Sequence, residues 1–444
     1  MRVRAVVSFR RTLCFGLGIL VLVASCAADP PELRATRVVS DGGTYSLIRD
    51  GQPYFIRGAG GHSHLDVLVA AGGNSIRTWG ADGLDEILDA AHRHGLTVCV
   101  GLWLGHERHG FDYQDRTAVR EQLEVSVGVV RRYKDHPAVL MWGIGNEMEG
   151  DGTNPAIWRA VEDIAREVKR IDPVHPTMTV IAELGNDKVQ RIDRWCPSID
   201  IIGVNSYGGL TTLGERYRSA GGSKPYIVTE FGAPGPWEVA TTPWGSPLEM
   251  SSTDKAEWYA RGYRKAVAEQ RALCLGSYAF YWGNKQETTA TWFGMLLPDG
   301  TRLGAVDAVV EAWTGAPPDN RCPRILSLEA DRAVRLQPGS TVTASVTAAD
   351  PEDDPLTFRW VLRSDTGTIG TGGDFQADEV SHDAAVSASG PSATVTLPDL
   401  PGGYRLFAYV FDGAGGAAVA NVPLHVEEPT IGDRSPDRTT PESR

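Results

Sequence analysis

The chain has 444 residues and a formal net charge of −13 at pH 7. This acidic balance argues against a nucleic-acid partner, because proteins that bind a phosphate backbone concentrate positive charge on one face. The length suffices for a barrel of about 250 residues together with a smaller second domain.

The first residues have the pattern of a secretory signal. Four arginines fall within residues 1–11, and the apolar run 13–23 follows them. This run is too short to span a bilayer as a mature helix. It ends in Leu22-Val23-Ala24-Ser25-Cys26, which resembles a bacterial lipobox. The resemblance implies that 1–26 is a lipoprotein signal peptide with lipidation at Cys26. It also implies an exported cell-envelope lipoprotein, periplasmic or on the outer surface, that meets the membrane through its lipid anchor. A transmembrane anchor is the alternative.

Strand and helix signals alternate from residue 38 to residue 315, after a hairpin-like start. Two amphipathic helical stripes stand out, one on Leu84, Ile87, Leu88 and Ala91, the other on Ile157, Val161, Ile164, Val168 and Ile171. Eight segments are predicted to be buried strands: 54–58, 75–78, 97–103, 139–144, 177–181, 201–205, 226–229 and 277–281. This alternation predicts an α/β fold with a parallel sheet, and eight units suit a (β/α)8 TIM barrel. A doubly wound open sheet is the alternative, although no GxGxxG follows the first strand.

Two glutamates stand where predicted strands end. Glu147 closes Trp142-Gly-Ile-Gly-Asn-Glu, and Glu230 lies in Val228-Thr-Glu-Phe-Gly. In a (β/α)8 barrel the carboxyl ends of all strands open onto one face, where catalytic groups converge. Two carboxyl groups about 5 to 5.5 Å apart on that face suit retaining glycoside hydrolysis.

The segments around both glutamates resemble motifs of clan A glycoside hydrolases, including families 2 and 5. The run from His136 to Glu147 is similar to the clan's fourth-strand acid/base motif, and the run from Lys224 to Gly232 to its seventh-strand nucleophile motif. The resemblance covers about 54–313. It implies a retaining β-glycosidase that hydrolyses O-glycosyl compounds, with Glu147 as acid/base and Glu230 as nucleophile. It needs no metal and no cofactor.

The same resemblance assigns four substrate-binding or supporting residues. Asn146 corresponds to the asparagine that hydrogen-bonds the sugar 2-hydroxyl, and Arg77 to the arginine that keeps the nucleophile charged. Tyr207 corresponds to a tyrosine that orients the nucleophile. Trp282 corresponds to an eighth-strand tryptophan that forms a sugar platform. The implied partner is an oligo- or polysaccharide, with a β-glucan as the first expectation.

Three alternatives to retaining glycoside hydrolysis remain. His62 and His64 follow the first strand, as in metal-dependent amidohydrolase barrels, but no histidine occurs between His175 and His382, where those enzymes need ligands. A glycosyl-transferring enzyme of the same clan, or a glycan-binding envelope lipoprotein without turnover, would share the fold.

From residue 322 to residue 427 the helical periodicity gives way to short strands with β-branched and aromatic residues. The run from Ala348 to Trp360 resembles polycystic-kidney-disease (PKD) and immunoglobulin-like modules, which implies a small all-β immunoglobulin-like sandwich. Its acidic turn at 350–354 is expected to be a solvated turn rather than a calcium site. Residues 428–444 are predicted to be a disordered tail. Cys99, Cys196, Cys274 and Cys322 show no zinc-type spacing, and the sequence cannot pair them.

Overall fold

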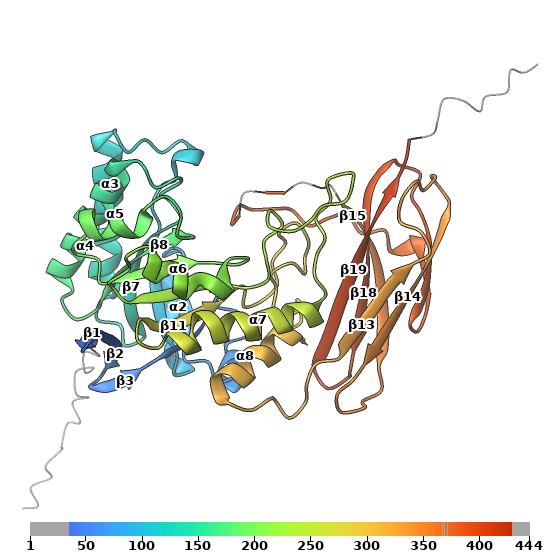
Figure 1. The fold of residues 1–444 in the computed structure, drawn as a ribbon, viewed down its shortest axis with the longest axis horizontal. Helices are drawn as coiled ribbons and strands as arrows, with labels where there is room; N and C mark the ends of the chain where they lie inside the picture. Colours follow the sequence, from blue (N-terminus) through green and yellow to red (C-terminus); the bar gives the residue numbers. More distant parts are fainter. Residues whose placement is uncertain (1–34, 366, 368, 371, 429–444) are drawn as a thin grey trace, which may run out of the picture. The chain divides into compact units, whose positions relative to one another are not determined.

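The computed structural model describes residues 35–428 except 366, 368 and 371 (Figure 1). The predicted signal peptide, Cys26 and the tail from residue 429 onwards lie outside the described residues. Within the described part of the chain, no helix combines the length and the apolar character needed to cross a bilayer.

Eight parallel strands close into a barrel, which confirms the predicted TIM-barrel architecture and rules out an open sheet. Every predicted strand forms, with shifts of only a few residues at the ends. The barrel order is β10, β11, β4, β5, β6, β7, β8, β9. The strands are β4 (Ile56–Gly60), β5 (Ser75–Arg77), β6 (Thr97–Leu102), β7 (Val139–Asn146), β8 (Thr177–Ala182), β9 (Ile201–Asn205), β10 (Tyr226–Phe231) and β11 (Cys274–Ala279).

Helices follow the strands along the chain and bury their apolar faces against the sheet. Leu84, Leu88 and Ala91 of the first predicted stripe are buried, and so are Ile157 and Val161 of the second. Burying each of the leucine, isoleucine and valine side chains contributes roughly 1.5–3 kcal/mol relative to leaving it exposed. The helices are α1 (Leu65–Ala70), α2 (Leu84–Arg93), α3 (Arg116–Tyr133), α4 (Pro155–Ile171), α5 (Lys188–Trp195), α6 (Leu213–Ser219), α7 (Ser252–Ala266) and α8 (Gly304–Thr314).

The barrel interior is packed with side chains, so ligands have access only at its ends. A small antiparallel sheet of β1 (Thr36–Asp41), β2 (Thr44–Arg49) and β3 (Gln52–Tyr54) precedes the barrel. Leu47 of β2 belongs to the same apolar cluster as Ile56, Met141 and other interior residues of the barrel. This sheet therefore covers the amino-terminal end of the strands and leaves the carboxyl end for a site.

Two four-stranded sheets follow the barrel and share one apolar core. The first orders β12 (Arg302–Leu303), β19 (Gly416–Val426), β18 (Gly402–Phe411) and β15 (Thr357–Asp365). The second orders β13 (Arg324–Ala330), β14 (Thr341–Ala349), β17 (Ser392–Thr396) and β16 (Val386–Ser389). Strand β12 precedes α8 in the chain, yet it pairs with β19. The last barrel unit and the C-terminal sheets therefore share backbone pairing across the predicted boundary at 315–322.

Two further sequence questions have structural answers. Cys99, Cys196, Cys274 and Cys322 are all free and buried, so none of them forms a disulfide. In the acidic turn after β14, Asp350 Oδ1 accepts hydrogen bonds from the backbone of Glu352 and Asp354. No group of three or more metal-ligating side chains suited to an ion occurs among the described residues.

Candidate active site

The strands that carry the two glutamates direct both side chains to one end of the barrel. Glu230 lies within β10, and Glu147 follows β7 directly. The register of β7 against β8 shifts between Ile144 and Asn146, and such a bulge re-aims the following side chains. Glu147 itself adopts a left-handed backbone with φ 53°, an uncommon conformation for a non-glycine residue. Residues held this way cluster at functional sites.

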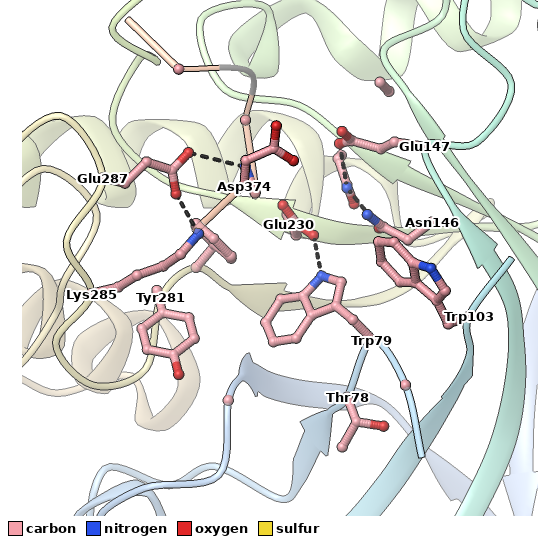
Figure 2. Close-up of a pocket in the computed structure, with 18 of the residues that line it drawn as sticks. Thr78, Trp79, Trp103, Asn146, Glu147, Glu230, Tyr281, Lys285, Glu287 and Asp374 are labelled. Carbon is pink, nitrogen blue, oxygen red and sulfur yellow. Dashed lines mark hydrogen bonds and ion pairs between the residues drawn. The ribbon is translucent and has the colours of Figure 1, made fainter. Parts of the chain in front are cut away.

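A cavity of about 800 Å³ opens at this end of the barrel, and both glutamates line it (Figure 2). Its size lies within the range of small-molecule sites. Aromatic rings of Trp79, Trp103, Trp237 and Tyr281 form much of its surface. The lining carries seven carboxylate side chains, which are Asp82, Glu147, Glu183, Glu230, Glu238, Glu287 and Asp374. Arg108 and Lys285 are the basic side chains, besides histidines, that face it among the described residues.

Three donors converge on the carboxylate of Glu230, which is only 6% exposed. Arg77 Nη1 and Trp79 Nε1 both donate to Oε1, at 2.9 and 2.7 Å. The hydroxyl of Tyr207 donates to Oε2 at 2.6 Å. Both oxygens are therefore fixed in direction, and the donors complement the negative charge that a nucleophile needs.

The environment of Glu147 favours the protonated form. Burial, followed by the negative charge of Glu230, raises the pKa of Glu147 from 4.5 to about 7. A hydrogen bond of 2.6 Å from Asn205 Nδ2 to Oε1 partly opposes this rise. The surroundings of Glu147 favour a protonated carboxyl, whereas three donors surround the carboxylate of Glu230. An acid/base and a nucleophile require such different surroundings.

Asn146 and Arg77 lie where the sequence predicted them, beside the two glutamates. Arg77 Nη2 donates to Asn146 Oδ1 at 2.6 Å, and Arg77 Nη1 also donates to the carbonyl of Thr229. Asn205 Nδ2 lies 3.2 Å from the same Asn146 oxygen. The structure therefore brings Arg77, Asn146, Glu147, Tyr207 and Glu230 into one hydrogen-bonded cluster.

Trp282 is not part of this cluster, and the sugar-platform prediction for it is wrong. Its side chain is fully buried, and Nε1 donates to the carbonyl of His64 at 3.3 Å. The aromatic side chains beyond β11 that face the cavity are Phe280 and Tyr281. Tyr281 also stacks on Trp79, with 6.1 Å between ring centroids. The residue before Trp282 thus faces the cavity, whereas Trp282 itself does not line it.

Several cavity residues were not predicted from the sequence. Asn205 ends β9 as a polar residue after an apolar run, the same signal that identified the two glutamates. Lys285 and Glu287 lie in the loop after β11, joined by an ion pair whose Glu287 side chain is 5% exposed. Asp374 belongs to the region of β-strands predicted at residues 322–427, called here the C-terminal module. No local pattern near Asp374 indicates that it contacts the barrel.

The histidines that follow β4 and β6 lie in different surroundings. His62 and His106 line the cavity, and His106 stacks between the rings of Trp103 and His109. Burial lowers the pKa of His106 to about 4, so its ring is neutral at physiological pH. His64 adopts a left-handed backbone just before α1.

Comparison with known proteins gives consistent results. Residues 68–236 match the family model described as "Glycosyl hydrolases family 2, TIM barrel domain". A β-glucuronidase of Pongo abelii is 25% identical over 262 residues, which are 52% of this chain and 37% of that protein. The β-glucuronidase of Rattus norvegicus is 29% identical over 219 residues, 42% of this chain and 32% of that protein. The chain thus spans about a third of the length of these curated relatives.

Solved structures with a similar fold are also β-glucuronidases. The β-glucuronidase of Bifidobacterium dentium, complexed with coumarin-3-O-glucuronide, has a TM-score of 0.52 and 20% identity, covering 64% of this chain and 50% of that one. A β-glucuronidase of Faecalibacterium prausnitzii has a TM-score of 0.51 and 17% identity, covering 64% and 52%. These structural likenesses concern the fold alone. The family match and the curated relatives support a clan A glycoside hydrolase, and the similarity to the family 2 TIM barrel domain covers residues 68–236.

Proposed function

We propose that this protein hydrolyses O-linked β-glycosides with retention of configuration, by double displacement. Glu230 attacks the anomeric carbon while Glu147 protonates the departing glycosidic oxygen, which forms a glycosyl ester on Glu230. Glu147 then removes a proton from water, and that water releases the sugar with its original anomeric configuration. Each step uses only groups that line the cavity.

One observation carries this proposal. Glu147 has a pKa of about 7 because it is buried near Glu230, while Arg77, Trp79 and Tyr207 all donate to Glu230. A general acid works best when its pKa lies near the working pH. The chemistry of glycoside cleavage needs one carboxyl that holds a proton and a second that does not, and this pair supports that division.

We further propose that the reacting sugar is neutral. The curated relatives are named β-glucuronidases, which suggests a uronide as the competing substrate. A uronide carries a carboxylate, and its binding requires a basic side chain that is not already paired with an acidic one. Arg108 already pairs with Asp374, and Lys285 with Glu287. In a cavity with this many carboxylates, a neutral glycoside avoids both repulsion and the loss of these pairs. The comparisons lend no support to a β-glucan in particular, so the identity of the neutral sugar is left to the assay.

The test is a panel of aryl β-glycosides that includes glucoside, galactoside, mannoside and glucuronide, assayed with the wild type and Glu230→Ala. The proposal expects turnover that the substitution abolishes, with a neutral glycoside preferred. Binding without turnover in both proteins would instead support a glycan-binding protein. Products formed only when a sugar acceptor is added would support a glycosyl-transferring enzyme. Preference for the glucuronide would refute the neutral-sugar proposal while leaving the mechanism intact.

Two sequence predictions remain proposals. One is export and lipid attachment at Cys26, which metabolic labelling with a radioactive fatty acid tests directly. Labelled wild type and unlabelled Cys26→Ala are expected, and an unlabelled wild type would overturn the prediction. The other is that the two C-terminal sheets form an immunoglobulin-like module of the PKD kind.

A further inference from the structure

The loop after β15 leaves the strands of the C-terminal module, and its residues Gly372, Gly373 and Asp374 line the barrel cavity. Backbone pairing closes the base of this loop, because Ser364 N donates to the carbonyl of Val380 at 2.9 Å. Residues 372–379 are described between these closing positions and belong to no helix or strand.

A buried ion pair within the C-terminal module holds the base of the loop, and hydrogen bonds connect this pair to the barrel. Asp365, the last residue of β15, lies 2.8 Å from Arg405, and the side chains are 4% and 1% exposed. Ser246, in the segment between β10 and α7, donates to Asp365 at 2.5 Å and accepts from Arg405 at 2.6 Å. Arg405 also donates to the carbonyl of Pro247. A buried pair with this many hydrogen bonds holds one geometry.

Beyond this anchor, residues 372–376 contact loops that follow three different barrel strands. Asp374 lies 3.4 Å from Arg108 Nη2 and 3.3 Å from His109 Nε2, both in the segment after β6. The Cα of Gly372 lies against the Trp237 indole, because a Cβ there would be only 3.0 Å from it. Trp237 belongs to the segment after β10.

The third contact is with the loop after β11. Gly373 N donates to Glu287 Oε1 at 3.3 Å, and Gln376 Oε1 accepts from Thr288 N at 2.6 Å. Figure 2 shows Asp374, Glu287 and Lys285 on the side of the cavity away from Trp103 and Asn146. None of the hydrogen bonds of residues 372–376 goes to Glu147 or Glu230. The segment therefore borders the outer part of the cavity and leaves the reacting pair to the barrel.

We propose that residues 372–376 form a wall of the substrate cavity, so that the C-terminal module is a specificity-determining part of the active site rather than an independent appendage. The ligand class is a neutral oligosaccharide, whose sugar units beyond the reacting one contact Asp374 and its neighbours. This inference rests on the proposed function for the identity of the ligand. A short aryl glycoside has no sugar unit beyond the reacting one, so its KM is expected to depend less on the wall than that of an oligosaccharide.

The experiment compares wild type with Asp374→Ala, because Asp374 lines the cavity. Asp383→Ala is the matched control, because Asp383 lies in the same module and outside the cavity lining. The probes are tetraoses of β-1,3-glucan, β-1,4-glucan, β-1,4-mannan and β-1,4-galactan, together with the aryl glycoside that the wild type hydrolyses fastest. Removing the Asp374 carboxylate from the wall is expected to raise KM for the preferred tetraose about tenfold. KM for the aryl glycoside is expected to rise less, and the Asp383→Ala control keeps wild-type kinetics on both probes.

A binding measurement separates this inference from the proposed function. In a Glu230→Ala background, calorimetry with the same tetraoses is expected to show about tenfold weaker binding when Asp374→Ala is added. The wild type could hydrolyse none of the substrates while Asp374→Ala still weakens tetraose binding. In that case the proposed function fails and the inference stands. Equal tetraose KM and affinity with and without Asp374 would overturn the inference, as would absence of tetraose binding by the Glu230→Ala protein. Thermal melting of Asp374→Ala equal to wild type excludes a folding defect as the cause.

Discussion

The guanidinium of Arg77 lies 2.9 Å from Oε1 of Glu230, with both side chains buried. These residues belong to β5 and β10, which are separated in the barrel by β4 and β11. The pair therefore spans the end of the barrel and connects two strands that are not paired through their backbones. It fixes the orientation of Glu230 and links β5 to β10 at this end of the barrel.

Replacing Arg77 is expected to affect both stability and activity. Removing one partner of a buried pair leaves an uncompensated charge, which costs about 3–5 kcal/mol. We expect Arg77→Ala to lower the free energy of unfolding by this amount in urea titration, and to lose turnover at temperatures where it stays folded. Arg77→Lys keeps the charge but lacks the fork that reaches Glu230, Thr229 and Asn146, so an intermediate loss is expected. Wild-type stability of Arg77→Ala would contradict the account of this pair.

The nucleophile variant tests the division of roles between the two glutamates. Glu230→Ala is expected to reduce kcat by at least about 10⁴-fold, as losses of a covalent catalyst do. Added azide then restores turnover and gives a glycosyl azide of inverted configuration, because the small anion fills the space of the missing carboxylate. Glu269→Ala, on the exposed surface, serves as the control. Unchanged turnover by Glu230→Ala would exclude it as nucleophile.

The alkaline limb of the pH profile should report the proton of Glu147. Its pKa is raised to about 7, so the acid form dominates below that pH and is lost as the pH rises through it. With a poor leaving group, kcat/KM is therefore expected to fall above about pH 7. The Asn205 hydrogen bond lowers this pKa, so Asn205→Ala should move the limb to higher pH. A limb that stays in place, or moves to lower pH, would contradict this assignment.

The Glu147→Gln variant supplies the complementary test. Its profile should lack the alkaline limb, since no proton remains to be lost. It should retain kcat/KM on 2,4-dinitrophenyl glycosides, whose leaving group needs no acid assistance in the first step, while kcat falls because water is no longer activated in the second step. On unactivated glycosides kcat/KM should fall about 10²- to 10⁴-fold. Equal losses of kcat/KM on both substrate types would argue that Glu147 has another role.

The buried ion pair between Asp365 and Arg405 predicts how firmly the C-terminal module is attached. Arg405→Ala leaves Asp365 buried without its cation, at an expected cost of about 3–5 kcal/mol in the free energy of unfolding. Arg332→Ala, an exposed arginine of the same module, should change it by less than about 0.5 kcal/mol. Differential scanning calorimetry measures both. Identical melting of the two variants would mean that the pair does not stabilise the attachment.

The barrel could be predicted from the sequence because its signals are local. Each strand is a short apolar run, and each helix carries one apolar stripe, as at Ile157 and Val161. The catalytic candidates were found by the same reasoning, since polar residues that end buried strands converge on one barrel face. Asn205 ends β9 and carries that signal too, so it could have been included.

Other parts of the site depend on geometry that a single sequence does not encode. Phe280, Tyr281 and Trp282 are consecutive aromatic residues beyond the end of β11, where regular alternation no longer fixes which ring faces the cavity. Trp282 was chosen by resemblance, and the structure buries it. Asp374 reaches the cavity through a contact between the module and the barrel, and neither its neighbours nor its spacing indicates that contact.

The most direct test of the central claim is covalent trapping of the nucleophile. A 2-deoxy-2-fluoro β-glycoside with a dinitrophenyl leaving group forms the glycosyl ester quickly and releases it slowly, and mass spectrometry of the digested protein locates the sugar. The account predicts one fluorosugar on the peptide that contains Glu230, and none in Glu230→Ala. A label on a different residue, or an inverted product from a wild type that turns over without any label, would contradict it.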